Sequence, residues 1–224
     1  MTTAQLDRVA LQMAADAGAE PLFKGVRNPR ARIPFPGAIC SSINEQVVHG
    51  IPSEDTKLRE GDILSIDFGV RLQGYCGDAA VTIPIGNISE DNRRLMDATK
   101  RVLEIAIEKA APAVRWSQVA SQMQRYAESA GFSVVRDFVG HGIGRKMHEE
   151  PKVPNFVSDE LLANDIILTE GMVLAVEPMI NAGTSAVRAL KNGWTVVTKD
   201  GKCSAHFEHT LAIVKGGCEV LTVK

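Results

Sequence analysis

The chain has 224 residues, with 25 Lys and Arg against 27 Asp and Glu and a formal charge of -2. This length can bury a substantial core without disulfides, and the balanced charge argues against a protein that binds nucleic acid through bulk electrostatics. No apolar run reaches the roughly 18 residues of a membrane-spanning helix, and the first residues lack the basic and apolar segments of a secretory signal. We therefore expect a cytoplasmic protein.

The first part of the chain predicts one helix and a pair of strands. Apolar residues at helical spacing predict a helix capped by Thr3 that runs to Ala17. Residues 19–36 are rich in Pro, Gly and Arg and are expected to form a loop. Residues 62–70 and 75–85 have the pattern of two strands, which would form a hairpin.

The rest of the chain mixes helices with strands. Ser89 is expected to cap a long amphipathic helix that Pro112 ends, and another helix is expected from about Ser117 to Gly131, with Tyr126 on its inner face. Further strands are predicted at residues 132–139, 172–177, 194–198 and 206–214. Because the elements do not alternate steadily as β-α-β, we predict the α+β class.

Four cysteines are scattered through the chain without a Cys-x-x-Cys pair. This pattern is typical neither of a zinc ribbon nor of a disulfide framework. We expect four reduced and mostly buried thiols, namely Cys40, Cys76, Cys203 and Cys218.

An internal repeat relates the two halves of the chain. Residues 5–18 align with 118–131, and residues 60–67 align with 170–177 as a turn, an apolar strand and a terminal carboxylate. The shared order predicts two related halves whose carboxylates meet at a central seam. The second half is expected to contain two helices. The first half has a counterpart only for the later of the two, so a leading helix is expected to be missing at the N-terminus.

Asp67 and Asp78 are the first candidates for chemistry. A hairpin centred between Leu72 and Gln73 would place them opposite one another, about 4.5–5.5 Å apart at Cβ, where like charges are destabilising. A raised pKa, a cationic side chain or a metal can relieve this repulsion, and the flanking residues offer no cationic side chain. The alternatives are therefore a metal site or two carboxylates at a solvent-exposed strand edge.

Three further residues favour the metal. Glu177 ends an apolar strand and Glu208 lies within one, and a buried carboxylate is costly unless it is paired or binds a cation. His141 lies between glycines that allow close approach; a phosphate-binding loop is the alternative, but it lacks the P-loop context. Four carboxylates and one imidazole predict an oxygen-rich dinuclear site suited to Mn, Fe, Co or Zn.

Five motifs, in this order, resemble the type I methionine aminopeptidases, and the likeness extends from about residue 3 to residue 224. The motifs are residues 44–52, residues 66–69 with Asp78, residues 140–151, residues 176–179 and residues 207–210. The resemblance implies the pita-bread fold of that family, with two pseudo-symmetric α+β halves around a dinuclear metal site. It also implies that residues 1–224 form a single metallo-aminopeptidase catalytic domain.

The resemblance assigns roles to the five candidate ligands. Asp67 would bind one of two divalent ions, His141 and Glu177 would bind the other, and Asp78 and Glu208 would bridge both. Such a pair of ions can hold a hydroxide and polarise a carbonyl together.

The resemblance also implies how substrate is held. Glu177 would act as general base, and His49 and His148 would flank the scissile amide. The substrate side chain would enter a pocket lined by Phe23, Val26, Phe35, Cys40, His49, Met147, His148 and Trp194. Residues 27–34 look like an insertion relative to short bacterial members of the family.

The expected activity is hydrolysis of the initiator Met from nascent polypeptides by a metal-activated hydroxide, with preference for a small second residue. The protein would be a cytoplasmic monomer, with the ribosome as a candidate partner and neither a specific nucleic acid nor a membrane. One alternative is an Xaa-Pro aminopeptidase or prolidase-type enzyme, whose usual large N-terminal domain is not found here. The other is a non-catalytic pita-bread binding protein, which would be expected to lose ligands.

Overall fold

The structure, a computed structural model, describes residues 1–223. Its helices are α1 (Thr3–Asp16), α2 (Glu90–Lys109), α3 (Trp116–Ser129) and α4 (Asp159–Ala163). Its strands are β1 (Glu20–Pro21), β2 (Cys40–Ile43), β3 (Gln46–Val48), β4 (Ile63–Leu72), β5 (Tyr75–Pro84), β6 (Ser133–Val134), β7 (Gly140–Gly142), β8 (Glu149–Val153), β9 (Val173–Val176), β10 (Met179–Asn181), β11 (Val187–Ala189), β12 (Val196–Thr198), β13 (Ser204–His206), β14 (His209–Val214) and β15 (Gly217–Val220). The predicted α+β class is confirmed.

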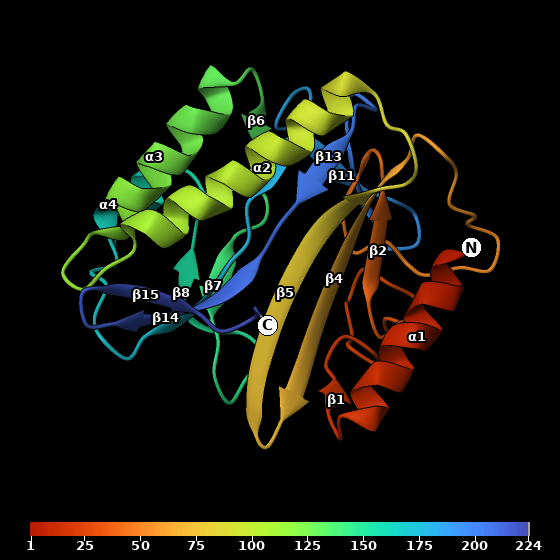
Figure 1. Cartoon of the computed structure of the whole chain (residues 1–224), viewed down its shortest axis with the longest axis horizontal. Helices are drawn as coiled ribbons and strands as arrows, with labels where there is room; N and C mark the ends of the chain where they lie inside the picture. The colour runs from red at the N-terminus through yellow and green to blue at the C-terminus, as the bar shows by residue number, and fades with distance from the viewer. Residues whose placement is uncertain (224) are drawn as a thin grey trace.

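Two sheets form the body of two lobes. In the first lobe, strands are ordered β1-β4-β2 with β5 paired to β4, and α1 lies beside them (Figure 1). In the second lobe, a five-stranded sheet is ordered β15-β14-β9-β7-β8, and α2 and α3 lie side by side over it (Figure 1). Two three-stranded sheets, β13-β10-β6 and β11-β12-β3, complete the fold.

The large core lies between the helices and the second sheet. Ser89 caps α2 by accepting a hydrogen bond from the backbone of Asn92, as a helix N-terminus requires.

On α3, Trp116 and Met123 are fully buried, whereas Tyr126 is 36% exposed. The prediction that Tyr126 faces inward was therefore wrong. The buried residues of this helix follow one another at intervals of three or four positions, and Tyr126 lies beside the stripe that they form.

The hairpin turn lies one residue later than predicted. Leu72 pairs with Tyr75, so the turn consists of Gln73 and Gly74, whose φ angles are 51° and 84°. Two consecutive positive φ angles are the requirement of a type I′ turn, which matches the twist of a hairpin, and glycine adopts such an angle without strain. The positive φ that Gly74 adopts without strain therefore sets the register of the hairpin.

This shift changes how the two aspartates face one another. Asp67 lies opposite Ala80, and Asp78 lies opposite Gly69, so the direct Asp67–Asp78 pairing was wrong. The two carboxylates are instead diagonal neighbours on the same face of the hairpin, a relation that still keeps them in mutual range. Asp78 is 3% exposed, which excludes the alternative of a solvent-exposed strand edge.

The internal repeat is present in three dimensions. Helices α1 and α3 have 14 residues each, and both are followed by a glycine with positive φ. The backbone N–H of Thr3 donates to Thr56 O at 3.0 Å, and the N–H of Trp116 donates to Ile166 O at 2.8 Å in the corresponding place. These equivalent contacts show two lobes built on one plan.

One long seam joins the lobes along β5 and residues 206–210. Ala80 and Glu208 form an antiparallel bridge through their backbones. On one side of this bridge Thr82 Oγ1 accepts from His206 N and donates to His206 O, both at 2.8 Å. The Thr82 hydroxyl thus continues the contact between the two segments beyond the backbone bridge.

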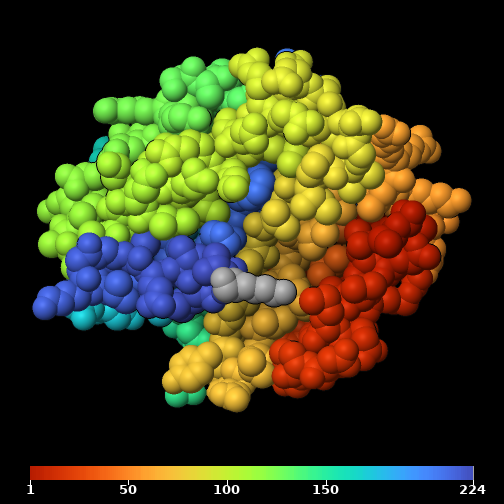
Figure 2. All heavy atoms as spheres, in the orientation of Figure 1, coloured from red at the N-terminus to blue at the C-terminus, as the bar shows by residue number. Residues whose placement is uncertain are grey.

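The two lobes differ in their helical cover. Helix α2 packs against α3 and also contacts β15, β13, β10 and β5, so it reaches both lobes. Among residues 1–223 the first lobe contains no counterpart of α2, and α1 lies by itself on the flank of the molecule (Figure 2). Val9 and Met13 of α1 are exposed.

Several predicted boundaries require correction. Thr2, and not Thr3, caps α1. The Thr2 hydroxyl accepts a hydrogen bond from Gln5 N, and the Gln5 side-chain oxygen accepts one from Thr2 N. The strand expected at residues 132–139 shortens to β6, and the one at 206–214 is interrupted between β13 and β14.

All four cysteines are free, and two of them are buried. No helix among the described residues has the length and apolarity to cross a bilayer.

Candidate active site

The five candidate ligands line one cavity of about 120 Å³ at the seam between the lobes. They come from different elements: Asp67 from β4, Asp78 from β5, His141 from β7, Glu177 from the end of β9, and Glu208 from between β13 and β14. Strands of both lobes therefore contribute to the same cluster.

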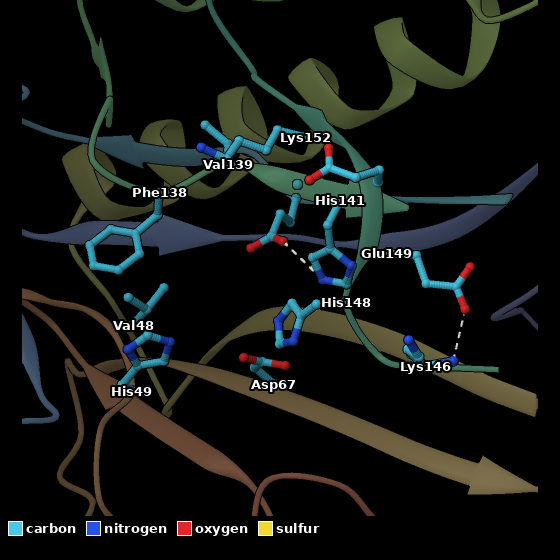
Figure 3. A pocket seen from close by; sticks show the side chains of 13 residues that line it. Val48, His49, Asp67, Phe138, Val139, His141, Lys146, His148, Glu149 and Lys152 are labelled. Atoms are coloured by element: carbon cyan, nitrogen blue, oxygen red, sulfur yellow. Dashed lines mark hydrogen bonds and ion pairs between the residues drawn. The ribbon is translucent and has the colours of Figure 1, made fainter. Parts of the chain in front are cut away.

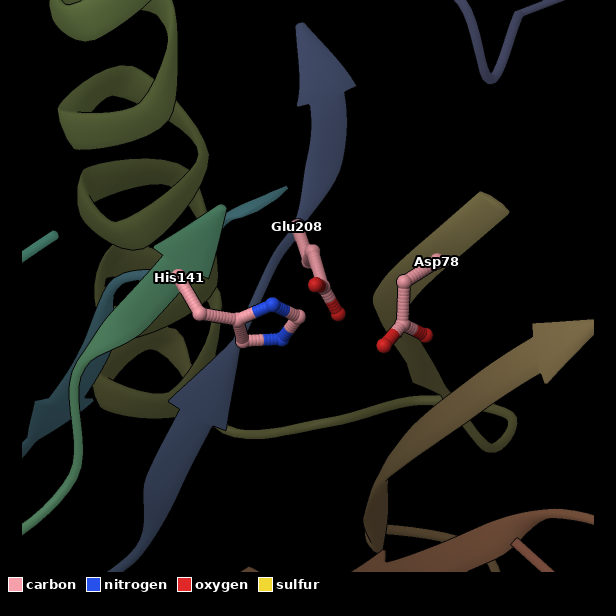
Figure 4. A group of neighbouring side chains, drawn as sticks. All are labelled: Asp78, His141 and Glu208. Atoms are coloured by element: carbon pink, nitrogen blue, oxygen red, sulfur yellow. The ribbon is translucent and has the colours of Figure 1, made fainter. Parts of the chain in front are cut away.

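Three of these side chains come closest together. One ligand atom each of Asp78, His141 and Glu208 lies within 4.8 Å of the other two. Figure 4 shows their carboxylates and imidazole pointing toward a common point from separate segments of the chain. A spacing of this kind is what one small cation bound by several side chains requires.

Burial makes the negative charges of this cluster costly. It raises the pKa of Asp78 to about 7, and it raises the pKa of Asp67 well above its usual range, with the charge of Asp78 adding to the effect. Burial, followed by repulsion from Asp78, also raises the pKa of Glu177 and of Glu208. A cation at their centre would offset both the cost of burying these charges and their mutual repulsion.

Buried oxygen atoms without a partner support the same conclusion. Within the described part of the chain, no hydrogen-bond partner reaches three buried oxygens, Asp67 Oδ1, Asp78 Oδ1 and Glu208 Oε1. Such atoms are rare in folded proteins unless a water or ion satisfies them. The donor set of carboxylate oxygens and one imidazole therefore fits divalent metal ions.

The two glycines beside His141 hold β7 close to its neighbours. A Cβ on Gly140 would lie 2.2 Å from Ala175 O, and one on Gly142 would lie 2.3 Å from Glu150 O. His141 Nδ1 lies 2.8 Å from Gly142 O. Donation of an N–H to that carbonyl fixes the tautomer and leaves the Nε2 lone pair facing the cluster.

Glu177 has one imidazole near each carboxylate oxygen. His141 Nε2 lies 3.7 Å from Oε1, and His206 Nε2 lies 3.7 Å from Oε2. The Asn155 side chain donates to the backbone oxygen of Glu177 at 3.2 Å and holds the main chain here. Sequence reasoning missed both Asn155 and His206, although His206 precedes Glu208 by two residues and so lies on the same face of an extended segment.

His49 and His148 face the cavity from opposite sides (Figure 3). His49 has a φ of 58°, which is rare for a residue with a side chain, and its ring lies edge-on to Phe138. Burial, with a smaller effect of His148, lowers the pKa of His49 to about 4. Burial also lowers the pKa of His148, whose ring centre lies 4.4 Å from that of His141. Both rings are therefore neutral at pH 7.

An apolar pocket adjoins the cluster. Phe35 and Trp194 meet edge to face at 5.2 Å, and the Trp194 indole N–H donates to Ile33 O. Phe23 and Cys40 complete this buried group, and Met147 packs against it. The eight predicted substrate-binding residues all line the 120 Å³ cavity: Phe23, Val26, Phe35, Cys40, His49, Met147, His148 and Trp194.

A larger cavity of about 800 Å³ opens from the same cluster. Sequence reasoning assigned no role to most of its wall, although some of these residues lie within the motifs at 44–52 and 140–151. The residues without an assigned role are Val48, Phe138, Val139, Lys146, Glu149, Glu150 and Lys152. The arrangement offers a small pocket with apolar walls beside the charged cluster and a larger cavity that opens from it, which suits the cleavage of a bond near one end of a long chain.

Comparisons with known proteins agree with this arrangement. The model of metallopeptidase family M24 matches residues 1–215. The chain is 48% identical to a methionine aminopeptidase of Clostridium perfringens and 45% identical to methionine aminopeptidase 1 of Bacillus subtilis, covering 100% and 99% of this chain and 86% of each relative. It superposes on the crystal structure of a Thermotoga maritima methionine aminopeptidase with a TM-score of 0.93 and 40% identity, covering 100% of this chain and 86% of that one.

Proposed function

Because the chain belongs to metallopeptidase family M24, as a type I methionine aminopeptidase, we propose that its central cavity hydrolyses the bond after the initiator Met of new polypeptides. The observation that carries this proposal is the convergence of Asp78, His141 and Glu208 from both lobes within 4.8 Å. The matches at 45–48% identity over the whole chain support it, and they favour neither an Xaa-Pro peptidase nor a non-catalytic protein.

The five clustered side chains are proposed to hold two divalent ions. Asp67 would bind one ion, His141 and Glu177 the other, and Asp78 and Glu208 would contact both. Ions held in this way acidify water and polarise a peptide carbonyl. The oxygen-rich donor set suits Mn, Fe, Co or Zn.

The protein groups around the cluster are proposed to handle protons and orientation. Glu177, whose carboxylate lines the central cavity, removes a proton from the attacking water. His49 and His148 are neutral and so can each donate one N–H, to the scissile amide and to the oxygen that gains charge during attack.

The apolar pocket is proposed to bind the side chain of the N-terminal Met. Its walls are Phe23, Phe35, Cys40 and Trp194, with the flexible thioether of Met147 beside them. An unbranched thioether fits such a pocket because it adapts to irregular apolar walls. The next residue of the substrate would lie between the two histidines, which supports a preference for small side chains there.

Further parts of the proposal concern the whole molecule. Residues 1–224 are proposed to act as one catalytic domain, because the ligands of one site come from both lobes. We also propose a monomer that acts in the cytoplasm, where new polypeptides are made, with the ribosome as a candidate partner.

A comparison of two peptides tests the proposed function. The purified chain, loaded with Mn or Co, is incubated with Met-Ala-Ser and with an Ala-Pro peptide, and a sample with EDTA serves as control. We expect release of Met from the first peptide only, and none in EDTA. Cleavage of the Ala-Pro peptide alone would identify an Xaa-Pro peptidase, and absence of any cleavage by a folded, metal-loaded sample would defeat the proposal.

A further inference from the structure

His206 is a buried histidine that the proposed mechanism does not use. The residue is 2% exposed, and its Nε2 atom is buried without a hydrogen-bond partner among residues 1–223. An orphaned buried ring nitrogen is uncommon and calls for a nearby acceptor or ligand. The charged atom in position to satisfy it is Glu177 Oε2, at 3.7 Å.

The backbone of His206 is held firmly at the seam between the lobes. Thr82 Oγ1 accepts from His206 N and donates to His206 O, and it also shares a hydrogen bond of 2.8 Å with Ser65. On its other side His206 pairs with Met179, which lies two residues beyond Glu177. Contacts on both sides fix where the ring lies relative to the carboxylate.

Each oxygen of Glu177 lies near one imidazole, but only the His206 ring can donate from Nε2, because the His141 Nε2 lone pair faces the cluster. Oε1 lies 3.7 Å from His141 Nε2, and Oε2 lies at the same distance from His206 Nε2. An N–H···O bond spans about 2.7–3.2 Å, so a movement of roughly 0.5–1 Å by the carboxylate reaches bonding range. Hydrogen bonds of catalytic groups often shorten in this way only when substrate is bound.

We propose that His206 is a positioning residue for Glu177: it donates its Nε2–H to Oε2 and thereby turns Oε1 toward the metal cluster and the attacking water. This inference rests on the proposed function. It follows the general pattern in which a ligating carboxylate is itself oriented by a hydrogen bond from outside the metal site. All five proposed ligands line the 120 Å³ cavity, whereas His206 is not among its lining residues, which favours positioning over direct metal binding.

Two substitutions at this position separate its possible roles. His206→Leu fills the space without a donor, and His206→Gln restores an N–H near the same place. His209→Leu is the matched control, because His209 lies on the opposite face of the segment, where its Nδ1 contacts Thr222 Oγ1 at 2.8 Å. Each variant is assayed for kcat and KM on Met-Ala-Ser, and its binding of Co²⁺ alone is measured by calorimetry.

We expect His206→Leu to lower kcat and the Co²⁺ affinity by about 10- to 100-fold, with KM within about twofold of wild type. His206→Gln should recover most of the lost kcat, and His209→Leu should match wild type. Both variants at position 206 should still bind as many Co²⁺ ions as wild type, because the five ligands remain.

Two outcomes would overturn the proposal. Unchanged kcat and Co²⁺ affinity in His206→Leu would show that the ring does not act on Glu177. Loss of one bound Co²⁺ in both variants would show that His206 is itself a ligand. Should His206→Leu fail to fold, His206→Met provides the same test. If wild type cleaves no peptide, the proposed function fails, and the Co²⁺ affinities alone decide the role of His206.

Discussion

Asp78 and Thr210 exchange two hydrogen bonds across the seam between the lobes. The backbone N–H of Asp78 donates to Thr210 Oγ1 at 3.0 Å, and the same hydroxyl donates to Asp78 O at 2.8 Å. Both residues are buried. A single hydroxyl group therefore places the backbone of a first-lobe ligand against the strand that follows Glu208.

Replacement of this hydroxyl should weaken the whole fold. Thr210→Val keeps the shape of the side chain but leaves a buried N–H and a buried C=O of Asp78 without partners. An unsatisfied buried group costs about 1–3 kcal/mol, so we expect a lower free energy of unfolding by at least that amount. Urea unfolding of the metal-free protein measures it, with exposed Thr169→Val as control. Equal midpoints for the two variants would contradict the role of the hydroxyl.

Removal of the Glu177 carboxylate should abolish most activity. Glu177→Ala removes both the proposed base and one ligand, and loss of general base catalysis alone costs on the order of 10²–10⁴-fold in rate. Steady-state cleavage of Met-Ala-Ser measures kcat. Glu128→Ala, at the exposed end of α3, should retain wild-type turnover. Near wild-type turnover of Glu177→Ala would refute the assigned role.

A shorter side chain at Met147 should relax the choice of N-terminal residue. Met147 packs beside Phe23, Cys40 and Trp194, and Met147→Ala enlarges the pocket on its flexible side. Discrimination by apolar pockets amounts to about 1–3 kcal/mol per methylene-sized change, so the preference for Met over Phe should fall roughly tenfold or more. The ratio of kcat/KM for Met-Ala-Ser and Phe-Ala-Ser is the measurement, and an unchanged ratio would show that Met147 does not shape the pocket.

The metal-free protein should respond to pH through Asp78. Burial raises the pKa of this carboxyl from its usual 3.8 to about 7. Its contribution to stability is therefore fully present below pH 3.8 and is lost as pH rises through about 7. Above that pH the difference amounts to at most about 4 kcal/mol, since each pKa unit corresponds to 1.36 kcal/mol.

Asp78→Asn tests this pH dependence, because the amide does not titrate. After removal of metal by chelation, the stability of the variant relative to wild type should be higher at pH 8 than at pH 5, as measured by thermal unfolding. Asp91→Asn serves as control, since the Asp91 side chain is 91% exposed. A difference between variant and wild type that does not change with pH would mean that Asp78 titrates normally.

Helix α2 could be predicted from the sequence because all of its signals are local. Ser89 caps it, acidic residues fill its first turn, and its apolar stripe repeats with the period of a helix. The two-lobed plan could also be predicted, because the shared order of the repeated segments survives in the sequence even where the residues differ.

The hairpin register and the role of position 206 depend on information that is not local. The register follows from positive φ at Gln73 and Gly74, and the sequence pattern alone allowed a turn one residue earlier. His206 becomes notable only when β13 brings its ring beside Glu177, which is 29 residues away in the chain. Short strands such as β2 and β3 were missed because three or four residues carry too little periodicity.

The seam has a consequence for the life of the protein in a cell that is short of metal. Because one ion would bind Asp78 of one lobe and Glu208 of the other, its binding energy adds directly to the energy that holds the lobes together. Chains that lack metal would then open more often at the seam and expose their backbone to proteases. Limited availability of the ion would thus reduce the abundance of the protein as well as its activity.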